Sequence, residues 1–332
     1  MTGVLFLDDC DARDTPLIGG KGAGLVELWQ AGMQVPPAFI VTTDAYRAFL
    51  ERSGIADVLP ELLEGANDGP SREAAHRQIS EVFRAAAGMK SRVWDLVRTV
   101  YDVLDAQMDE HPVAVAVRSS ATAEDTAEAS FAGEYESELW IRGADEVCAS
   151  VARCWASLFN PHALAYLDHV GVAPTDVAMA VVVQVMVPAE AAGVMMTLNP
   201  VTGARDTIVI ESALGLGLGV VDGHLTPDHF ELSRATYKVG VRMVVPKARQ
   251  YALDAATGRV RLFDVPAARQ REPSVSDDEL ADIARLGIEI DERLGKPMDI
   301  EWAIGRNGDG TRRLYLLQAR PETVWSRNSE HT

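Results

Sequence analysis

Two short segments near the end of the chain, residues 299–303 (DIEWA) and 316–322 (LLQARPE), constrain its fold most strongly. Both combine apolar and polar residues in alternation, which is typical of strands with two different faces. Residues 305–311 between them are rich in glycine, asparagine and aspartate, the residues that tight turns favour. The three segments together predict a β-hairpin.

The predicted hairpin gathers polar side chains on one face, because alternate residues of a strand point to the same side. Asp299 and Glu301 share a face in the first arm, and Gln318 and Arg320 share one in the second. Symmetric pairing sets Glu301 opposite Gln318 and Asp299 opposite Arg320, unless a bulge shifts the register by one. Oxygen ligands beside a guanidinium suit Mg²⁺ and a polyphosphate. The alternative is a surface hairpin whose charged residues face water.

Length and charge narrow the class of protein. The chain has 332 residues, which is enough for two lobes, and its 47% hydrophobic content is that of ordinary globular proteins. The net charge of −18 argues against nonspecific binding to nucleic acid or to an anionic membrane. Three scattered cysteines form neither a disulfide framework nor a zinc pattern, which favours a reducing, cytoplasmic location. We expect no signal peptide, and the longest apolar run, residues 178–183, is too short to span a bilayer.

The first part of the chain reads as a lobe of helices and strands, which we place at residues 1–183. A glycine-rich stretch at 18–24 precedes a helix, and Thr43 or Asp44 is the expected N-cap of another. Residues 50–110 read as mostly helical with a loop near 65–69. The expected strands and further helices lie at 36–42, 113–117, 144–158 and 161–169.

The second part changes to strands, and we place a second lobe at residues 184–326 with a frayed tail at 327–332. Ser276 and Glu279 form a capping box for a helix that ends near residue 294. The expected strands lie at 179–187, 193–198 and 207–211, followed by a meander over 228–263.

Two cations stand in settings that favour anion binding. Lys21 lies among four glycines at a helix start, where exposed amides and the helix dipole attract an anion, although the P-loop spacing is absent. The alternative is a flexible turn with a solvated lysine. Arg118 ends an apolar strand, before Ser119 and Ser120, and is placed to clamp phosphate oxygens. Its alternative is a salt bridge to Glu124 or Asp125.

Two further stretches are candidates for nucleotide contacts. Residues 130–134 (SFAGE) have the composition of a small flap over phosphates. Gln184, Met186 and Val187 end an apolar strand at the entry to the second lobe, where a linker backbone can hydrogen-bond an adenine edge. The alternative for this segment is a core strand followed by a bend.

Taken together, these segments resemble one family. The chain is similar to the N-terminal nucleotide-binding domain of phosphoenolpyruvate synthase, pyruvate phosphate dikinase and rifampin phosphotransferase, a variant of the ATP-grasp fold. This implies an α/β (α+β) fold of two lobes with ATP and Mg²⁺ between them. The matching stretches occur in family order: 19–23 (GGKGA), 117–125 (VRSSATAED), 130–133 (SFAG), Gln184 with Met186 and Val187, 192–194 (AGV), 199–203 (NPVTG), 226–228 (TPD), 299–302 (DIEW) and 318–321 (QARP).

The resemblance also implies a role for each matching position. Phosphates would be contacted by three cations, a flap would cover them, a short linker would hold adenine, and two oxygen ligands would bind Mg²⁺. These roles fall, in that order, on Lys21, Arg118 and Arg320; on Gly133 and Ser137; on Gln184 with the backbone of Met186 and Val187; and on Glu301 and Gln318.

Three positions depart from the family pattern. Glu134 stands where the family commonly has glutamine, Leu218 stands where it commonly has glutamate, and Met196 replaces an aromatic residue. The first two bear on catalysis, and they motivate a second hypothesis in which the chain is a non-catalytic, nucleotide-binding regulatory subunit.

The family's phosphorylated histidine has no counterpart here. None of the seven histidines lies in the Gly-Gly…Ser-His context of the family's swivelling domain. We therefore expect the ATP-binding, phosphoryl-transferring subunit of a split dikinase. It would convert ATP to AMP and phosphate with a partner protein that carries the histidine and the acceptor site. The alternative is an ATP-binding domain excised from a longer enzyme of the family.

Overall fold

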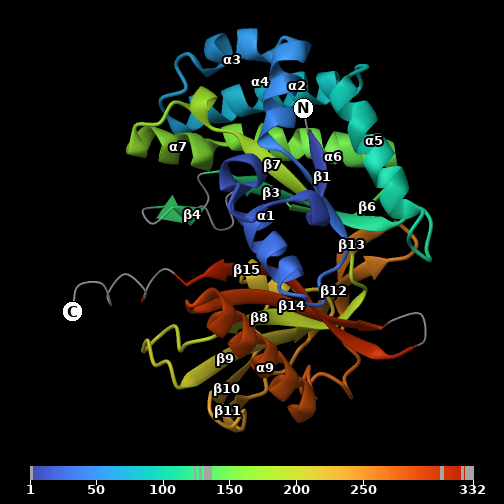
Figure 1. Ribbon diagram of the computed structural model, residues 1–332, viewed down its shortest axis with the longest axis vertical. Coiled ribbons are helices and arrows are strands. Elements are labelled where there is room, and N and C mark those ends of the chain that lie inside the picture. Colours follow the sequence, from blue (N-terminus) through green and yellow to red (C-terminus); the bar gives the residue numbers. More distant parts are fainter. Residues whose placement is uncertain are drawn as a thin grey trace. The chain divides into compact units, whose positions relative to one another are not determined.

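The computed structural model describes residues 3–122, 125–126, 129–130, 137–306, 310–322 and 325, the pairs 125–126 and 129–130 by their backbone alone. It divides into two compact units (Figure 1). The first comprises Met1–Val26 and Pro37–Met186, and the second comprises Glu27–Pro36 and Val187–Thr332. Residues 27–36, from early in the chain, thus belong to the second unit. A single boundary between residues 183 and 184, as expected from the sequence, would place them in the first.

The first unit is built on a five-stranded antiparallel sheet, one face of which is covered by helices (Figure 1). Its strands, in spatial order, are β1 (Val4–Phe6), β2 (Ala38–Val41), β7 (Met179–Val185), β3 (Ala114–Ala121) and β6 (Ser137–Arg142). The covering helices are α2 (Thr43–Ser53), α3 (Ile55–Leu63), α4 (Gly69–Ala87), α5 (Arg92–Asp105), α6 (Ala144–Ala156) and α7 (Pro161–Val170). Short 3-10 turns lie at η1 (Leu7–Asp9), η2 (Ser157–Phe159) and η3 (Pro174–Asp176), and β4 (Asp125–Thr126) pairs with β5 (Ala129–Ser130).

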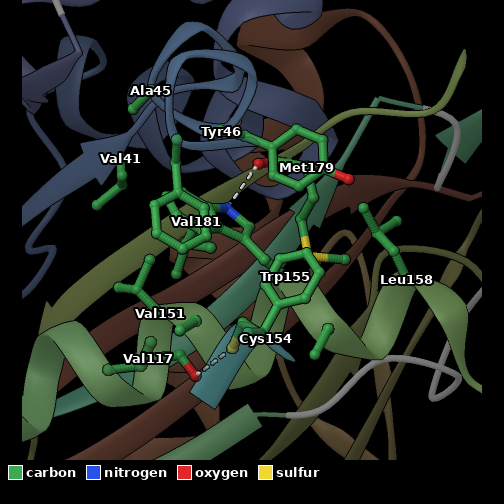
Figure 2. Close-up of a cluster of buried hydrophobic side chains, with 14 of the residues drawn as sticks. Val41, Ala45, Tyr46, Val117, Val151, Cys154, Trp155, Leu158, Met179 and Val181 are labelled. Atoms are coloured by element: carbon green, nitrogen blue, oxygen red, sulfur yellow. Dashed lines mark hydrogen bonds between the residues drawn. The ribbon is translucent and has the colours of Figure 1, made fainter. Parts of the chain in front are cut away.

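An aromatic core holds these helices on the sheet. The indole of Trp155 is fully buried and donates a hydrogen bond to the Met179 carbonyl at 3.0 Å (Figure 2). The ring of Phe49 lies 4.9 Å from that of Trp94 and 5.1 Å from that of Trp155. Alternate strand residues such as Val117 point into this core. Because neighbours along a strand point to opposite faces, Arg118 is directed to the other side of the sheet.

The second unit is a six-stranded antiparallel sheet with one long helix. In spatial order its strands are β11 (Val239–Met243), β10 (Asp228–Ser233), β9 (Thr207–Leu214), β8 (Ala189–Met196), β14 (Met298–Arg306) and β15 (Arg312–Pro321). Helix α9 (Asp277–Leu294) packs on β8, β9 and β14, and its Gly287 lies against Met195. The predicted capping box is confirmed, since Ser276 and Glu279 exchange hydrogen bonds of 3.2 and 2.8 Å.

Three local predictions needed correction. The N-cap of α2 is Thr42, whose hydroxyl accepts a hydrogen bond from the Ala45 amide at 3.3 Å, and not Thr43 or Asp44. Strand β3 runs past Arg118 to Ala121, because its small residues continue to pair with β7. The expected meander is also divided: β10 and β11 belong to the large sheet, while β12 (Arg249–Asp254) and β13 (Arg259–Asp264) form a separate two-stranded sheet.

The glycine-rich segment 214–219 adds a short helix, α8 (Leu218–Val221), next to the sheet of the second unit. A Cβ built on Gly217 would lie 3.4 Å from the Cβ of Ala192 on β8. Leu218, the position where the resemblance expects glutamate, is half-buried there. In the part of the chain that the structure describes, no helix is long and apolar enough to cross a membrane.

Candidate functional site

The first unit brings three of its predicted site residues to one face of its sheet. Arg118 on β3 lies opposite Ser137 on β6, and Gln184 on β7 lies opposite Ala116 on β3. Directly opposed residues share a face in an antiparallel sheet, and Ala116 and Arg118 are two residues apart on one strand. Arg118, Ser137 and Gln184 therefore lie on the face away from the helical core. Gly133, predicted to belong to the flap, lies outside the described residues.

The glycine-rich segment that carries Lys21 is packed against the end of β3. Helix α1 (Thr15–Gln30) is interrupted at Gly19, where φ is 71° and ψ is 172°. The Gly22 amide donates a hydrogen bond of 2.9 Å to the Ser120 hydroxyl, which donates in turn to the Ile18 carbonyl at 2.9 Å. Ser119 accepts a hydrogen bond of 3.4 Å from the Lys21 ammonium. Lys21 thus lies beside β3, the strand that carries Arg118. It follows the interruption of α1 at Gly19, and the neighbouring Gly22 amide already donates to Ser120.

Substitution of Gly19 tests how much the close contact with Ser120 contributes to stability. A Cβ at residue 19 would lie 2.0 Å from the Ser120 carbonyl oxygen, so alanine demands both a displaced strand and a backbone conformation, φ 71° and ψ 172°, that is essentially restricted to glycine. We expect Gly19→Ala to lower the free energy of unfolding by about 3 kcal/mol. The control is Gly54→Ala, since Gly54 also has a positive φ, +74° with ψ of 8°, but nothing within 4 Å, and about 1 kcal/mol is expected for its left-handed backbone alone. Equal losses in urea unfolding would show that the contact with Ser120 is unimportant.

The predicted adenine segment ends the first unit and begins the second. Gln184 is 3% exposed, and its Nε2 has no hydrogen-bond partner among the residues described. The Met186 amide donates to the Ala114 carbonyl at 2.9 Å, and the Val187 carbonyl accepts from the Ala189 amide at 2.8 Å. Those two backbone groups are occupied. Recognition of a base edge here would therefore use the Met186 carbonyl, the Val187 amide and the Gln184 side chain.

The hairpin that first suggested a site has the predicted register. Glu301 lies opposite Gln318 and Asp299 lies opposite Arg320, and the bulge follows Glu301 without shifting these pairs. Strand β14 is flanked on its other side by β8, so it is an inner strand of the large sheet. Gln318 is only 6% exposed. The hairpin is therefore not a peripheral one, although the side chains of Arg320 and Asp299 remain 38% and 22% exposed.

Within this hairpin, Asp299 holds Arg320. The Arg320 guanidinium donates to Asp299 Oδ2 from Nε at 2.8 Å and from Nη2 at 2.6 Å. Burial raises the pKa of Asp299, the carboxylates of Glu301 and Glu322 add to the rise, and Arg320 opposes it. Asp299 is thereby a positioning residue for the guanidinium.

Glu301 and Gln318 offer oxygen atoms next to this cation. The buried Gln318 Oε1 has no hydrogen-bond partner within the described ranges, which is costly unless a ligand satisfies it. A carboxylate and an amide oxygen on neighbouring strands fit Mg²⁺, which prefers oxygen ligands and usually takes few from protein. The described residues contain no cluster of three or more histidine, cysteine, aspartate or glutamate side chains suited to a metal. A two-ligand magnesium site is compatible with that finding.

The same face of the second sheet changes from polar to apolar along the hairpin. Ala303, two residues beyond Glu301, lies opposite Ala192 and packs with it and with Val187. Ala189, Tyr315 and Leu317 surround this small apolar cluster. One end of the face is thus a closely packed apolar cluster, in which Ala192 and Ala303 are each 1% exposed, and the other end carries the carboxylate, the amide oxygen and the guanidinium.

A buried polar network around Asp228 was not predicted from the sequence. The Lys247 ammonium donates to both oxygens of this carboxylate, at 2.7 and 2.9 Å, and Ser274 donates from its amide at 2.9 Å and its hydroxyl at 2.7 Å. Asp228 is fully buried and Lys247 is 4% exposed. Removing either partner would leave a buried charge uncompensated. The network ties the segments before α9 to β10.

The mixed α/β fold with two antiparallel sheets fits a nucleotide-binding domain of ATP-grasp type. The chain belongs to the family of pyruvate phosphate dikinase AMP/ATP-binding domains, whose model matches residues 15–332. The resemblance seen in the sequence is thereby confirmed.

Several curated relatives are named phosphoenolpyruvate synthase. A probable phosphoenolpyruvate synthase of Methanocaldococcus jannaschii is 40% identical over 326 residues, which cover 98% of this chain and 27% of that protein. The phosphoenolpyruvate synthase of Aeropyrum pernix is 38% identical and that of Aquifex aeolicus 36%, with 98% and 99% of this chain covered. The matches cover 43% and 40% of those two proteins. The chain therefore spans less than half the length of these relatives.

Proposed function

We propose that this chain is the ATP-binding, phosphoryl-transferring part of a dikinase that acts with a histidine on a partner protein. The observation that supports it most is a pair of buried side-chain amides. Gln184 Nε2 and Gln318 Oε1 have no hydrogen-bond partner among the atoms of the described chain. These are the positions to which the resemblance assigns adenine and the metal. A donor suits a base nitrogen, and an oxygen suits Mg²⁺.

The phosphates would be bound by Lys21, Arg118 and Arg320. Phosphoryl transfer asks little covalent chemistry of a protein and depends on positioning and on neutralising charge that develops on the phosphate oxygens. Arg118 presents a planar fork of donors that matches phosphate. Arg320 brings a second positive charge, and Asp299, which accepts from its Nε and Nη2, fixes the orientation of that guanidinium before any ligand arrives. Ser137, opposite Arg118, is the described member of the proposed flap.

Mg²⁺ would be held by Glu301 and Gln318, and it would supply positive charge against the polyphosphate. The Glu301 carboxylate contributes the negative charge that keeps the ion at this place in the sheet. The Gln318 amide contributes a neutral oxygen, which can bind the ion without first losing a proton. Val187, which the resemblance assigns to adenine, would pack on the base.

The partner's histidine would accept the β-phosphoryl group. The bond between the α- and β-phosphates would break to release AMP, and water would then release the γ-phosphate as inorganic phosphate. The phosphohistidine would pass its group to an acceptor bound by the partner. The relatives support placing ATP binding and the histidine in separate parts, because this chain matches less than half of each of them. The partner is either a separate protein or a further part of a longer chain.

A binding experiment and a turnover experiment together test the proposal. Calorimetry with Mg²⁺ should show ATP binding to the chain alone, and AMP should form only when a histidine-bearing partner is added. ATP binding with no AMP under any pairing would favour the regulatory subunit instead. The supporting observation for that alternative is the apolar Leu218 at a position where the resemblance expects glutamate. Absence of ATP binding would contradict both.

The acid side of the pH profile tests the contact between Asp299 and Arg320. Only the ionised carboxylate holds the guanidinium strongly, so the contact weakens as the pH falls through the raised pKa of Asp299. We expect AMP formation to fall at a higher pH than an ordinary aspartate would give. Asp299→Asn should lower the rate at neutral pH about tenfold and remove this acid-side decline. An unchanged decline in the variant would assign it to another group.

A further inference from the structure

The segment that follows β15 is held against the loop that follows β8. The half-buried Trp325 donates a hydrogen bond from its indole nitrogen to the Pro200 carbonyl at 2.8 Å. Its ring lies directly on Gly203, where an added Cβ would come within 2.7 Å of two ring carbons. Gly203 also has a positive φ of 72°, so both its backbone and its neighbour favour glycine. Residues 199–204 thus form a seat for the indole, called the indole seat below.

The indole seat is shaped by hydrogen bonds of its own. The Asn199 Oδ1 accepts from the Val201 amide at 2.9 Å and from the Thr202 amide at 3.0 Å. The Gly203 amide donates to the Asn199 carbonyl at 2.8 Å. Because the loop is fixed by these bonds, the contact with Trp325 is better explained as an anchor for the segment that carries the indole than as a support for the loop.

The anchored segment begins where the ladder of the hairpin ends. Strand β15 is the last described strand of its sheet, and Pro321 closes its pairing with β14, opposite Met298. A proline has no amide hydrogen to donate to the ladder, and the ends of strands open more readily than their centres. The preceding pair is Arg320 with Asp299. Arg320 therefore lies next to a strand end that would fray unless the residues after it are held.

Glu322 connects that strand end to the indole. Its amide donates to the Pro297 carbonyl at 2.9 Å, which continues the pairing one residue beyond Pro321. Its carboxylate accepts from the Trp325 amide, with both oxygens at 3.1 Å. A continuous set of contacts thus runs from the indole seat through Trp325 and Glu322 to the end of β15.

We propose that Trp325 is a positioning residue for Arg320, because it anchors the end of β15 and so keeps the guanidinium where the phosphates would bind. The inference rests on the proposed function and deepens it. Asp299 sets the orientation of the guanidinium within the hairpin, whereas Trp325 limits the movement of the strand end that carries it. A small displacement of such a group is costly, since a charged contact with phosphate requires close approach.

The test measures ATP affinity by calorimetry with excess Mg²⁺ on the full chain, so no partner is needed. Trp325→Ala should weaken ATP binding about tenfold. Trp325→Phe keeps a ring on Gly203 but loses the donor to Pro200, so it should weaken binding less. Gly203→Ala displaces the ring from the other side of the contact and should act as Trp325→Ala does. Because both changes break one contact, together they should cost no more than either alone.

The control for Gly203→Ala is Gly258→Ala. Gly258 has a similar φ of +66° in the same unit, with none of the described atoms within 4 Å of an added Cβ. It should keep the wild-type affinity for ATP.

The Arg320→Met background separates positioning from a merely structural role. Arg320→Met should weaken ATP binding by itself, and Trp325→Ala added to it should change the affinity little, since its effect acts through the guanidinium. An equal loss from Trp325→Ala in both backgrounds, or no loss in either, overturns the inference while the proposed function stands. An Arg320→Met protein that binds ATP as tightly as the wild type, or a wild-type chain that binds no ATP, overturns the proposed phosphate site and the inference with it.

Discussion

Replacing Glu301 with glutamine is expected to lower the rate of AMP formation by about 100-fold or more. The substitution keeps the shape of the side chain but removes the only formal negative charge of the proposed metal pair, and loss of one electrostatic group at such a centre typically costs this much. Raising the Mg²⁺ concentration should recover part of the rate. The assay is AMP release at saturating ATP, with the partner present, over a range of Mg²⁺ concentrations.

Glu289→Gln is the matched control for Glu301→Gln. Glu289 is a half-exposed glutamate of the same unit, paired with Arg293 on α9 at 3.7 Å. It should behave as the wild type at every Mg²⁺ concentration. If Glu301→Gln retained full activity with an unchanged Mg²⁺ requirement, the metal site would have to be placed elsewhere.

Replacing Arg118 with methionine is expected to weaken ATP binding and to reduce turnover by about 1,000-fold. Methionine keeps the apolar stem of the side chain but removes the charged fork that would bind phosphate oxygens. Arg118 lies on the face away from the helical core, so its replacement removes no contact of that core. Calorimetry, AMP release and urea unfolding on one preparation separate these effects.

Arg98→Met is the control for that experiment. Arg98 on α5 pairs with Asp145 at 2.8 Å on the surface of the same unit, and its loss should leave ATP binding intact. An Arg118→Met protein that binds ATP as tightly as the wild type would contradict the phosphate role. An Arg118→Met protein that unfolds much more easily would instead show that the guanidinium is structural.

The hairpin register was predictable because it follows from two local properties. The period of two places Asp299 with Glu301 and Gln318 with Arg320, and the turn sets which residues oppose. The start of α9 was predictable for a similar reason, since a capping box is encoded within four residues. Local signals of this kind depend on no distant part of the chain.

Other features depend on contacts between distant residues and were not predictable in this way. The contact between Gly19 and Ser120 joins residues about a hundred positions apart, and it decides where Lys21 lies. The contact of Trp325 with the indole seat joins the segment after β15 to the loop after β8, which neither segment specifies by itself. Likewise, helix α1, which is interrupted at Gly19, begins in the first unit, but its last residues, from Glu27, belong to the second.

The central claim is that this chain passes a phosphoryl group from ATP to a histidine on a partner. The most direct measurement mixes the chain, Mg²⁺ and ATP labelled at the β-phosphorus with a protein that carries the family's Gly-Gly…Ser-His segment. The account predicts label on that protein in an acid-labile, base-stable form, together with one AMP for each group transferred. ATP binding accompanied by ADP, or by no labelled partner, would contradict it.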